Sequence, residues 1–224
     1  MFDSLRLYEL PGMRRNMLRA SSSTRPTIWI VEENGVRAVI KDFSANRFLF
    51  RNSVGRLLIW REARAYKRLQ GMRGVPSLYR VIDGLALVTE YIPGRSLENL
   101  EKAMRLPDSF FEGMKDLVDC IHERGLAHCD LKRAANTLLG NDGLPYIVDW
   151  AASISEREFG FPPLNLVYKR FLLDDHMAVI KLKLRHTPET VRPDEQDRYE
   201  YRGSVEIIIR AIRDRLREFL QRTA

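Results

Sequence analysis

Cysteine and long apolar runs are the features that this sequence most clearly lacks. Its only two cysteines are Cys120 and Cys129, too few for a disulfide framework and typical of a reducing compartment. No stretch approaches the roughly 20 apolar residues of a membrane-spanning helix. Residues 1–20 mix arginines with apolar residues and do not resemble a signal peptide. We therefore expect a cytoplasmic protein.

Internal repeats and low-complexity tracts are also missing, and the composition is that of a folded chain. The 224 residues are 45% hydrophobic and 30% charged, which excludes a disordered protein and indicates one large domain or two small lobes. The formal net charge is +7. This surplus attracts anions without choosing among nucleic acid, anionic lipid, nucleotide and phosphosugar.

The first part of the chain indicates a small antiparallel sheet with one helix. Two β-branched runs, 27–31 and 36–41, flank Asn34-Gly35, and residues 77–82 and 85–92 flank Asp83-Gly84. Both dipeptides are strong signals for hairpin turns. Between the hairpins, residues 54–69 have helical apolar spacing and end near Gly71, a suitable C-terminal cap.

The second part is mainly helical and starts at a chain break predicted at Pro93-Gly94. The next long helix is predicted to begin with a capping box of Ser109 and Glu112 and to end at Gly125, with Cys120 in its core. The elements expected after it are a polar loop at 127–136, a hairpin at 137–149, and helices at 168–184 and 204–221. The fold class is therefore α+β.

Lys41 and Glu62 are the first group of polar residues whose predicted positions are hard to explain as ordinary surface positions. Glu62 lies four residues after Leu58 and four before Tyr66, so helical geometry puts this acid on the inward stripe. An inward carboxylate needs a cation. Lys41, at the end of a strand, is the nearest candidate, although a strand-end lysine alone more often points into water.

Asp130, Asn136 and Asp149 form the second group. The first two lie on the loop that enters the hairpin, and Asp149 closes the returning strand. Their oxygens should converge on a small volume, and carboxylate and amide oxygens are ligands that Mg²⁺ accepts. Each of them alone is more often a turn residue.

Taken in order, these residues resemble the protein-kinase-like superfamily. Ile40-Lys41 is similar to its Val-Ala-Ile-Lys element, Glu62 to its helix C glutamate, and His128-Cys129-Asp130 to its His-Arg-Asp loop. Asn136 is similar to the loop asparagine and Asp149-Trp150-Ala151 to Asp-Phe-Gly. The short sequence motifs at residues 42–44, 74–76 and 90–94 most resemble those of lipopolysaccharide core sugar kinases and RIO-like kinases.

The resemblance implies a two-lobed kinase-like fold, with an N-lobe at 1–91 and a C-lobe at 92–224, that uses ATP and Mg²⁺. Lys41 would hold the α- and β-phosphates, Glu62 would orient Lys41, and Asp149 and Asn136 would bind Mg²⁺. Asp130 would orient the acceptor hydroxyl, and Lys132 would steady the γ-phosphate. The residues implied to contact the nucleotide elsewhere are Thr89 as gatekeeper, Glu90 and Ile92 at the hinge, and Ser22 and Ser23 in the phosphate loop.

The sequence departs from the family pattern at several points. Residues 20–24 replace the Gly-rich loop, and Asn136 follows Asp130 by six residues instead of five, so one residue must bulge. Ala151 replaces the usual glycine. After Asp149 there is no Ala-Pro-Glu, which favours a sugar acceptor over a protein. We also predict that Asp174 or Asp175 is a buried anchor for the catalytic-loop backbone.

Several alternatives stay open beside a sugar kinase. Lys132 favours a RIO-like serine/threonine protein kinase, and a pseudokinase would bind nucleotide without chemistry. A nucleic-acid-binding module is weakly supported by scattered arginines, and we expect no specific nucleic acid partner. Zinc held by Cys120, His122, His128 and Cys129 lacks finger spacing. Helix 204–221 and the basic N-terminus raise the alternative of peripheral contact with an anionic membrane surface.

Overall fold

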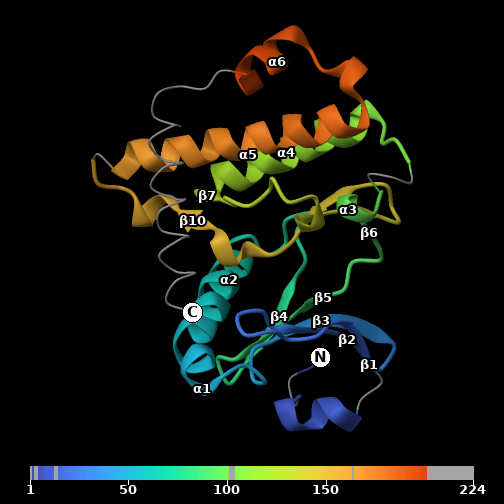
Figure 1. The fold of residues 1–224 in the computed structure, drawn as a ribbon, viewed down its shortest axis with the longest axis vertical. Helices are drawn as coiled ribbons and strands as arrows, with labels where there is room; N and C mark the ends of the chain where they lie inside the picture. Colours follow the sequence, from blue (N-terminus) through green and yellow to red (C-terminus); the bar gives the residue numbers. More distant parts are fainter. Residues whose placement is uncertain (1, 3–4, 13–14, 101–103, 163, 201–224) are drawn as a thin grey trace.

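The computed structural model describes residues 2, 5–12, 15–100, 104–162 and 164–200. It shows an α+β fold with a five-stranded antiparallel sheet at one end and a group of helices at the other (Figure 1). In spatial order the strands are β1 (Arg15–Arg19), β2 (Thr27–Glu33), β3 (Val36–Asp42), β5 (Ala86–Glu90) and β4 (Leu78–Ile82). The predicted helix 204–221 and the membrane hypothesis that depends on it lie outside the described residues.

The other elements form the helical part and its small sheets. Helices are α1 (Phe48–Phe50), α2 (Arg56–Arg68), α3 (Leu97–Leu100), α4 (Asp108–Glu123), α5 (Leu164–His186) and α6 (Pro193–Glu200). Short strands are β6 (Gly94–Ser96), β7 (Leu126–Ala127), β8 (Thr137–Gly140), β9 (Pro145–Ile147) and β10 (Ile154–Ser155). Among the described residues, no helix combines the length and the apolar character needed to cross a bilayer.

All three predicted hairpins are confirmed, as β2–β3, β4–β5 and β8–β9. The turns of the first two show why these residues occur there. Asn34 and Gly35 have φ of 52° and 78°, the left-handed conformation that a two-residue hairpin turn requires at both central positions. Asp83 and Gly84 also have positive φ, 52° and 67°. Glycine and short polar residues adopt this conformation with the least strain.

The main sheet separates two environments because successive side chains of β3 point to opposite faces. Ala38 and Ile40 are fully buried on one face, in a cluster with Phe2 and Val88. The alternate face, which carries Lys41, looks toward a cavity between the sheet and the helical part. A lysine near the end of this strand is thereby directed inward.

The largest hydrophobic cluster joins the two parts of the chain. It contains Tyr66 of α2 together with Phe110 and Met114 of α4, Trp150, and Leu182 of α5. The helices α4 and α5 pack against each other across the end of the molecule opposite the sheet (Figure 1). The core is therefore continuous across the predicted boundary at residues 91 and 92.

Some expectations about this part are wrong. The helix α4 begins at Asp108 with Pro107 as its N-cap and without a side-chain cap, so Ser109 already lies inside the helix and forms no capping box. Cys120 is exposed. Gly94 belongs to β6, which pairs with β8, and a Cβ at Gly94 would collide with the Leu139 carbonyl. This glycine permits close strand pairing instead of simply breaking the chain.

Candidate functional site

Lys41 is the centre of the candidate site. Its Nζ donates to Glu62 Oε2 at 2.6 Å and to Asp149 Oδ1 at 2.7 Å. Strand β3 carries Lys41, α2 carries Glu62, and Asp149 follows β9. The side chain of Glu62 is only 2% exposed, so its carboxylate depends on this cation. The predicted inward pair of Lys41 and Glu62 is confirmed.

The charges of this cluster keep Lys41 protonated. Burial alone would lower the pKa of Lys41, but the negative charges of Glu62 and Asp149 and their hydrogen bonds raise it above its usual value. Burial alone would raise the pKa of Asp149, but the charge and hydrogen bond of Lys41, together with weaker effects of other nearby cationic groups, lower it below its usual value. A cation thus stands between two carboxylates at the edge of the cavity.

Asp149 is held in an unusual backbone conformation directly before a buried anchor. Its φ and ψ are 66° and 67°, a left-handed conformation that aspartate and asparagine tolerate better than most residues. The next residue, Trp150, is fully buried, and its ring makes edge contacts with those of Tyr66 and His128. These contacts fix the chain at Trp150 while the Asp149 carboxylate stays turned toward Lys41.

Asp130 and Asn136 meet across the loop, as the predicted convergence requires. Asn136 Nδ2 donates to the Asp130 carbonyl at 2.9 Å and lies 3.2 Å from Asp130 Oδ2. A tight helical turn, Ala134–Asn136, accommodates the six-residue spacing. The Asn136 carbonyl accepts from the N–H of Val148 at 3.0 Å, which connects the loop to the residue before Asp149.

Asp175 anchors the other end of this loop, as predicted for Asp174 or Asp175. It is 1% exposed, and its carboxylate accepts from the backbone N–H of His128 at 2.7 Å and of Cys129 at 3.0 Å. Cys129 has a positive φ of 67°, which these bonds hold in place. His128 is fully buried and its Nε2 lies 3.0 Å from the Val148 carbonyl.

The cavity between the sheet and the loop collects most of the residues predicted for a nucleotide site. Those that line it are Lys41, Glu62, Thr89, Glu90, Ile92, Asn136 and Asp149. Asp130 is not among the lining residues, but it contacts Asn136, which is. The cavity wall therefore combines the charged groups around Lys41 with apolar side chains such as Ile30, Val39 and Leu138.

In the predicted hinge at residues 89–92, the backbone N–H groups of Glu90 and Ile92 differ in their hydrogen bonding. Thr89 is buried, and the N–H of Glu90 already donates to the Ser77 carbonyl at 2.8 Å. Within the described part of the chain, the N–H of Ile92 has no backbone acceptor. Ile92 thus offers a backbone donor at the cavity wall, whereas the Glu90 N–H is occupied.

Ser22 and Ser23 are not brought to the cavity wall. They lie in the turn between β1 and β2, where the sequence placed a phosphate loop, but the lining there comes from Leu18 and Arg19. The carbonyls of Ser22 and Ser23 accept from Asn46 Nδ2 at 2.7 and 3.4 Å. Asn46 thus fixes the shape of the turn.

Lys132 is not among the residues that line the cavity, whereas the next residue, Arg133, is. Lys132 Nζ lies 3.5 Å from Asp174 Oδ1. Arg133 instead lines the cavity, with Nη1 3.5 Å from Asp130 Oδ2. Sequence reasoning missed Arg133 because the direction of a loop side chain depends on the backbone conformation.

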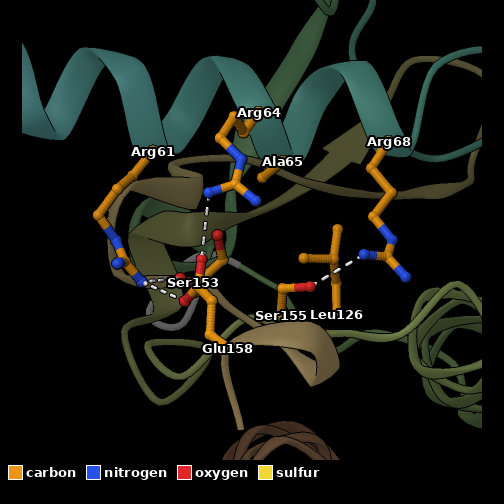
Figure 2. A pocket seen from close by; sticks show the side chains of 8 residues that line it. All are labelled: Arg61, Arg64, Ala65, Arg68, Leu126, Ser153, Ser155 and Glu158. Carbon is orange, nitrogen blue, oxygen red and sulfur yellow. Dashed lines mark hydrogen bonds and ion pairs between the residues drawn. The ribbon is translucent and has the colours of Figure 1, made fainter. Parts of the chain in front are cut away.

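Three arginines on α2 tie this helix to the chain that follows Asp149 (Figure 2). Arg61 donates to the Ser153 carbonyl at 2.6 Å, Arg68 to Ser155 Oγ at 2.9 Å, and Arg64 lies 3.4 Å from a Glu158 oxygen. Their spacing of three and four residues places them on one helix face. These contacts fix α2, and with it Glu62, against residues 153–158.

The residues weighed as a zinc site from the sequence are not assembled as a set. Cys120 is exposed on α4, whereas His128 is buried against Val148. Burial and the nearby charge of Asp175 raise the pKa of Cys129, so its thiol stays protonated. In the part of the chain that the structure describes, neither cysteine belongs to a group of ligand-type side chains close enough to share one metal ion.

The donor set in the cavity around Lys41 fits Mg²⁺. The Asp149 carboxylate and the Asn136 amide line the same cavity. Asn136 uses Nδ2 toward Asp130, which leaves its carbonyl oxygen for another partner. Hard oxygen donors of this kind suit Mg²⁺ bound together with phosphate oxygens.

The sequence matches no protein-family model and no curated protein.

Proposed function

We propose that this protein is an ATP- and Mg²⁺-dependent phosphotransferase that phosphorylates a hydroxyl group, built on a two-lobed fold of the protein-kinase type. The observation that carries the proposal is the ion pair of Lys41 with Glu62 and Asp149, beside the contact of Asp130 with Asn136. Phosphoryl transfer is mainly a matter of positioning and charge neutralisation. A fixed cation, two metal-binding oxygens and a carboxylate base supply these requirements.

The roles of the residues follow from their contacts. Lys41, held by the buried Glu62, would neutralise phosphate oxygens of ATP, and Asp149 and Asn136 would hold Mg²⁺. The bound metal ion would neutralise charge on the phosphates. Asp130 would orient the acceptor hydroxyl and accept its proton, and Arg133 at 3.5 Å from Asp130 would attract an anionic acceptor or the γ-phosphate.

The adenine would lie against the apolar part of the cavity wall. The N–H of Ile92 would donate to the base, with Thr89 behind it. The turn that holds Ser22 and Ser23 presents carbonyls to Asn46, so phosphate binding would depend on Lys41 and Arg133 more than on this turn.

The acceptor we favour is a sugar hydroxyl of the lipopolysaccharide-core type. The pairing of Lys132 with Asp174 supports this choice, because Lys132 was the residue that favoured a serine/threonine acceptor. A RIO-like protein kinase stays the main alternative.

Phosphoryl transfer tests the proposal directly. Purified protein with MgATP is offered core-type sugars, glycolipid and protein acceptors, and products are followed by ³¹P NMR and ADP release. We expect transfer to a sugar hydroxyl, and a loss of about 100-fold or more in Asp130→Asn, which lacks the carboxylate base. Asp83→Asn, in an exposed turn of the sheet, is the matched control and should keep full activity.

The other outcomes discriminate among the alternatives. Transfer only to protein would support the RIO-like alternative. Equal turnover by Asp130→Asn would contradict the assignment of the base, and nucleotide binding without transfer to any acceptor would favour a pseudokinase.

A further inference from the structure

A second group of ligand-type side chains lies outside the cavity, where α4 and α5 pack together. Asp119 and His122 are three residues apart on α4 and therefore share one helix face. His176 faces them from α5, with its ring 5.0 Å from that of His122 between centroids. One candidate ligand atom from each of these three residues lies within 4.8 Å of the other two.

One pair in this group already has the separation of two ligands on one metal ion. His176 Nε2 lies 3.4 Å from Asp119 Oδ1. Two ligands of a tetrahedral Zn²⁺ ion with bonds of about 2.0–2.1 Å are separated by about 3.4 Å. One ion could therefore contact both atoms without a rearrangement of the helices.

The third residue is oriented by a buried carboxylate. His122 Nε2 lies 3.2 Å from Asp175 Oδ2, which leaves its Nδ1 as the nitrogen for a metal. Metal-binding histidines commonly use their second nitrogen in this way, and the carboxylate fixes the ring and its tautomer. This carboxylate partner is 1% exposed, so the imidazole has a rigid support.

The group is also open to solvent on one side. The side chains of His176 and Asp119 are 33% and 48% exposed. The three residues line a surface depression together with Glu123 and Lys169. A metal ion could enter from solvent and keep a water molecule in its fourth position.

We propose that Asp119, His122 and His176 form a Zn²⁺ site with one water-occupied position. We further propose that this site is coupled to the loop at residues 128–136, which contains Asp130 and Asn136. Two imidazole nitrogens and one carboxylate suit Zn²⁺, whereas Mg²⁺ prefers oxygen ligands alone. The coupling runs through Asp175, which contacts His122 and also accepts from the N–H groups of His128 and Cys129. Zn²⁺ on Nδ1 would strengthen donation from Nε2 and hold Asp175 in place.

Calorimetric titration of tag-free protein with ZnCl₂ tests the binding site. We expect one ion per chain, with affinity reduced about 10-fold or more in His176→Gln and in Asp119→Asn. Asp116→Asn, an exposed change on the same helix, is the matched control and should bind normally. In the wild type, Co²⁺ should give the absorption bands of tetrahedral coordination.

Cys120 provides a second control because it is exposed beside Asp119. Normal binding by Cys120→Ser would support the proposed ligands. No saturable binding, equal affinity in His176→Gln, or loss of binding in Cys120→Ser would each overturn the site.

Hydrogen exchange tests the coupling independently of any enzymatic activity. In the wild type, Zn²⁺ should slow exchange of the His128 and Cys129 amides several-fold, because both donate to Asp175. His176→Gln should abolish this protection. Stoichiometric Zn²⁺ binding that leaves both amides unchanged would overturn the coupling.

Discussion

At the residue scale, the proposed site depends on how Lys41 is balanced by two carboxylates of different exposure. Glu62 is buried at 2%, whereas the side chain of Asp149 is 38% exposed. Glu62 can therefore serve as a permanent partner of Lys41. Under the proposed function, the more exposed Asp149 would exchange partners when phosphates and Mg²⁺ bind.

Replacing Lys41 should reveal this dependence as a loss of stability. Lys41→Met leaves Glu62 as a buried charge without its cation, and we expect a loss of about 3 kcal/mol in the free energy of unfolding. Lys41→Met/Glu62→Met removes both charges and should recover most of the loss. Urea unfolding measures these two variants and Glu62→Met, and simple additivity of the two single changes would contradict a direct pair.

The ion pair of Asp149 should give stability that depends on pH. Burial opposes the negative form of Asp149, but Lys41 outweighs it and lowers the pKa below the usual 3.8. A carboxyl group with a lowered folded-state pKa stabilises the fold above its unfolded value, and this stability is lost as the pH falls through the folded value.

Asp149→Asn tests this dependence, because asparagine tolerates the left-handed backbone. The variant should be less stable than the wild type by on the order of 1 kcal/mol at neutral pH, since the pair is partly exposed. The difference should shrink as the pH falls below 3.8. Asp83→Asn, also at positive φ, controls for the backbone. A difference that is constant down to pH 2, about two units below the usual pKa, would contradict the ion pair.

Individual residues also mark what the sequence could and could not predict about the site. The inward position of Glu62 was predictable because helical spacing fixes the side of the helix on which a residue lies. The position of Arg133 at the cavity was not predictable. Side-chain direction in that loop depends on the positive φ of Cys129 and on the turn Ala134–Asn136. Neither feature has a local signature.

At the element scale, structure stabilised by nearby residues was predictable and structure stabilised by distant residues was not. The hairpins β2–β3 and β4–β5 were predicted from the turn dipeptides and the strand-type runs that flank them. The strand β1 was missed because it is an edge strand with exposed side chains at Met17 and Leu18. The strand β6 was missed because its partner β8 lies more than forty residues away.

The anchor between α5 and the loop is, like the pair of Lys41 and Glu62, a contact between distant elements that was predicted from the sequence. Asp175→Ala would leave the buried N–H groups of His128 and Cys129 without their charged acceptor. We expect a loss of about 3 kcal/mol in unfolding free energy and faster hydrogen exchange at both amides.

The adjacent aspartate is the matched control for this anchor. Asp174 forms partly exposed ion pairs with Lys132 and Arg170, so Asp174→Ala should reduce stability by less than about 1 kcal/mol and should leave the two amides protected. Equal effects of the two substitutions would show that Asp175 has no special role in the loop.

At the scale of the whole molecule, the sheet and the helices meet at the cavity that contains Lys41. The helix α2 is fastened by Arg61 and Arg68 to the chain after Asp149, and the hydrophobic cluster continues from α2 into α4 and α5. Lys41 and Arg133 both line this cavity, together with the acidic Glu62 and Asp149. The α+β class was predictable from composition and periodicity, whereas the shape of this cavity required the strand pairing and loop anchors.

The central claim is that this cavity holds the phosphates of ATP beside Lys41, and calorimetric titration with MgATP tests it most directly. We expect one nucleotide per chain, with affinity about 10-fold or more weaker in Lys41→Met, which loses a charge-assisted contact. Lys67→Met, an exposed change on α2, is the matched control and should bind like the wild type. Binding that is absent in the wild type, or equal in Lys41→Met and Lys67→Met, would contradict the account.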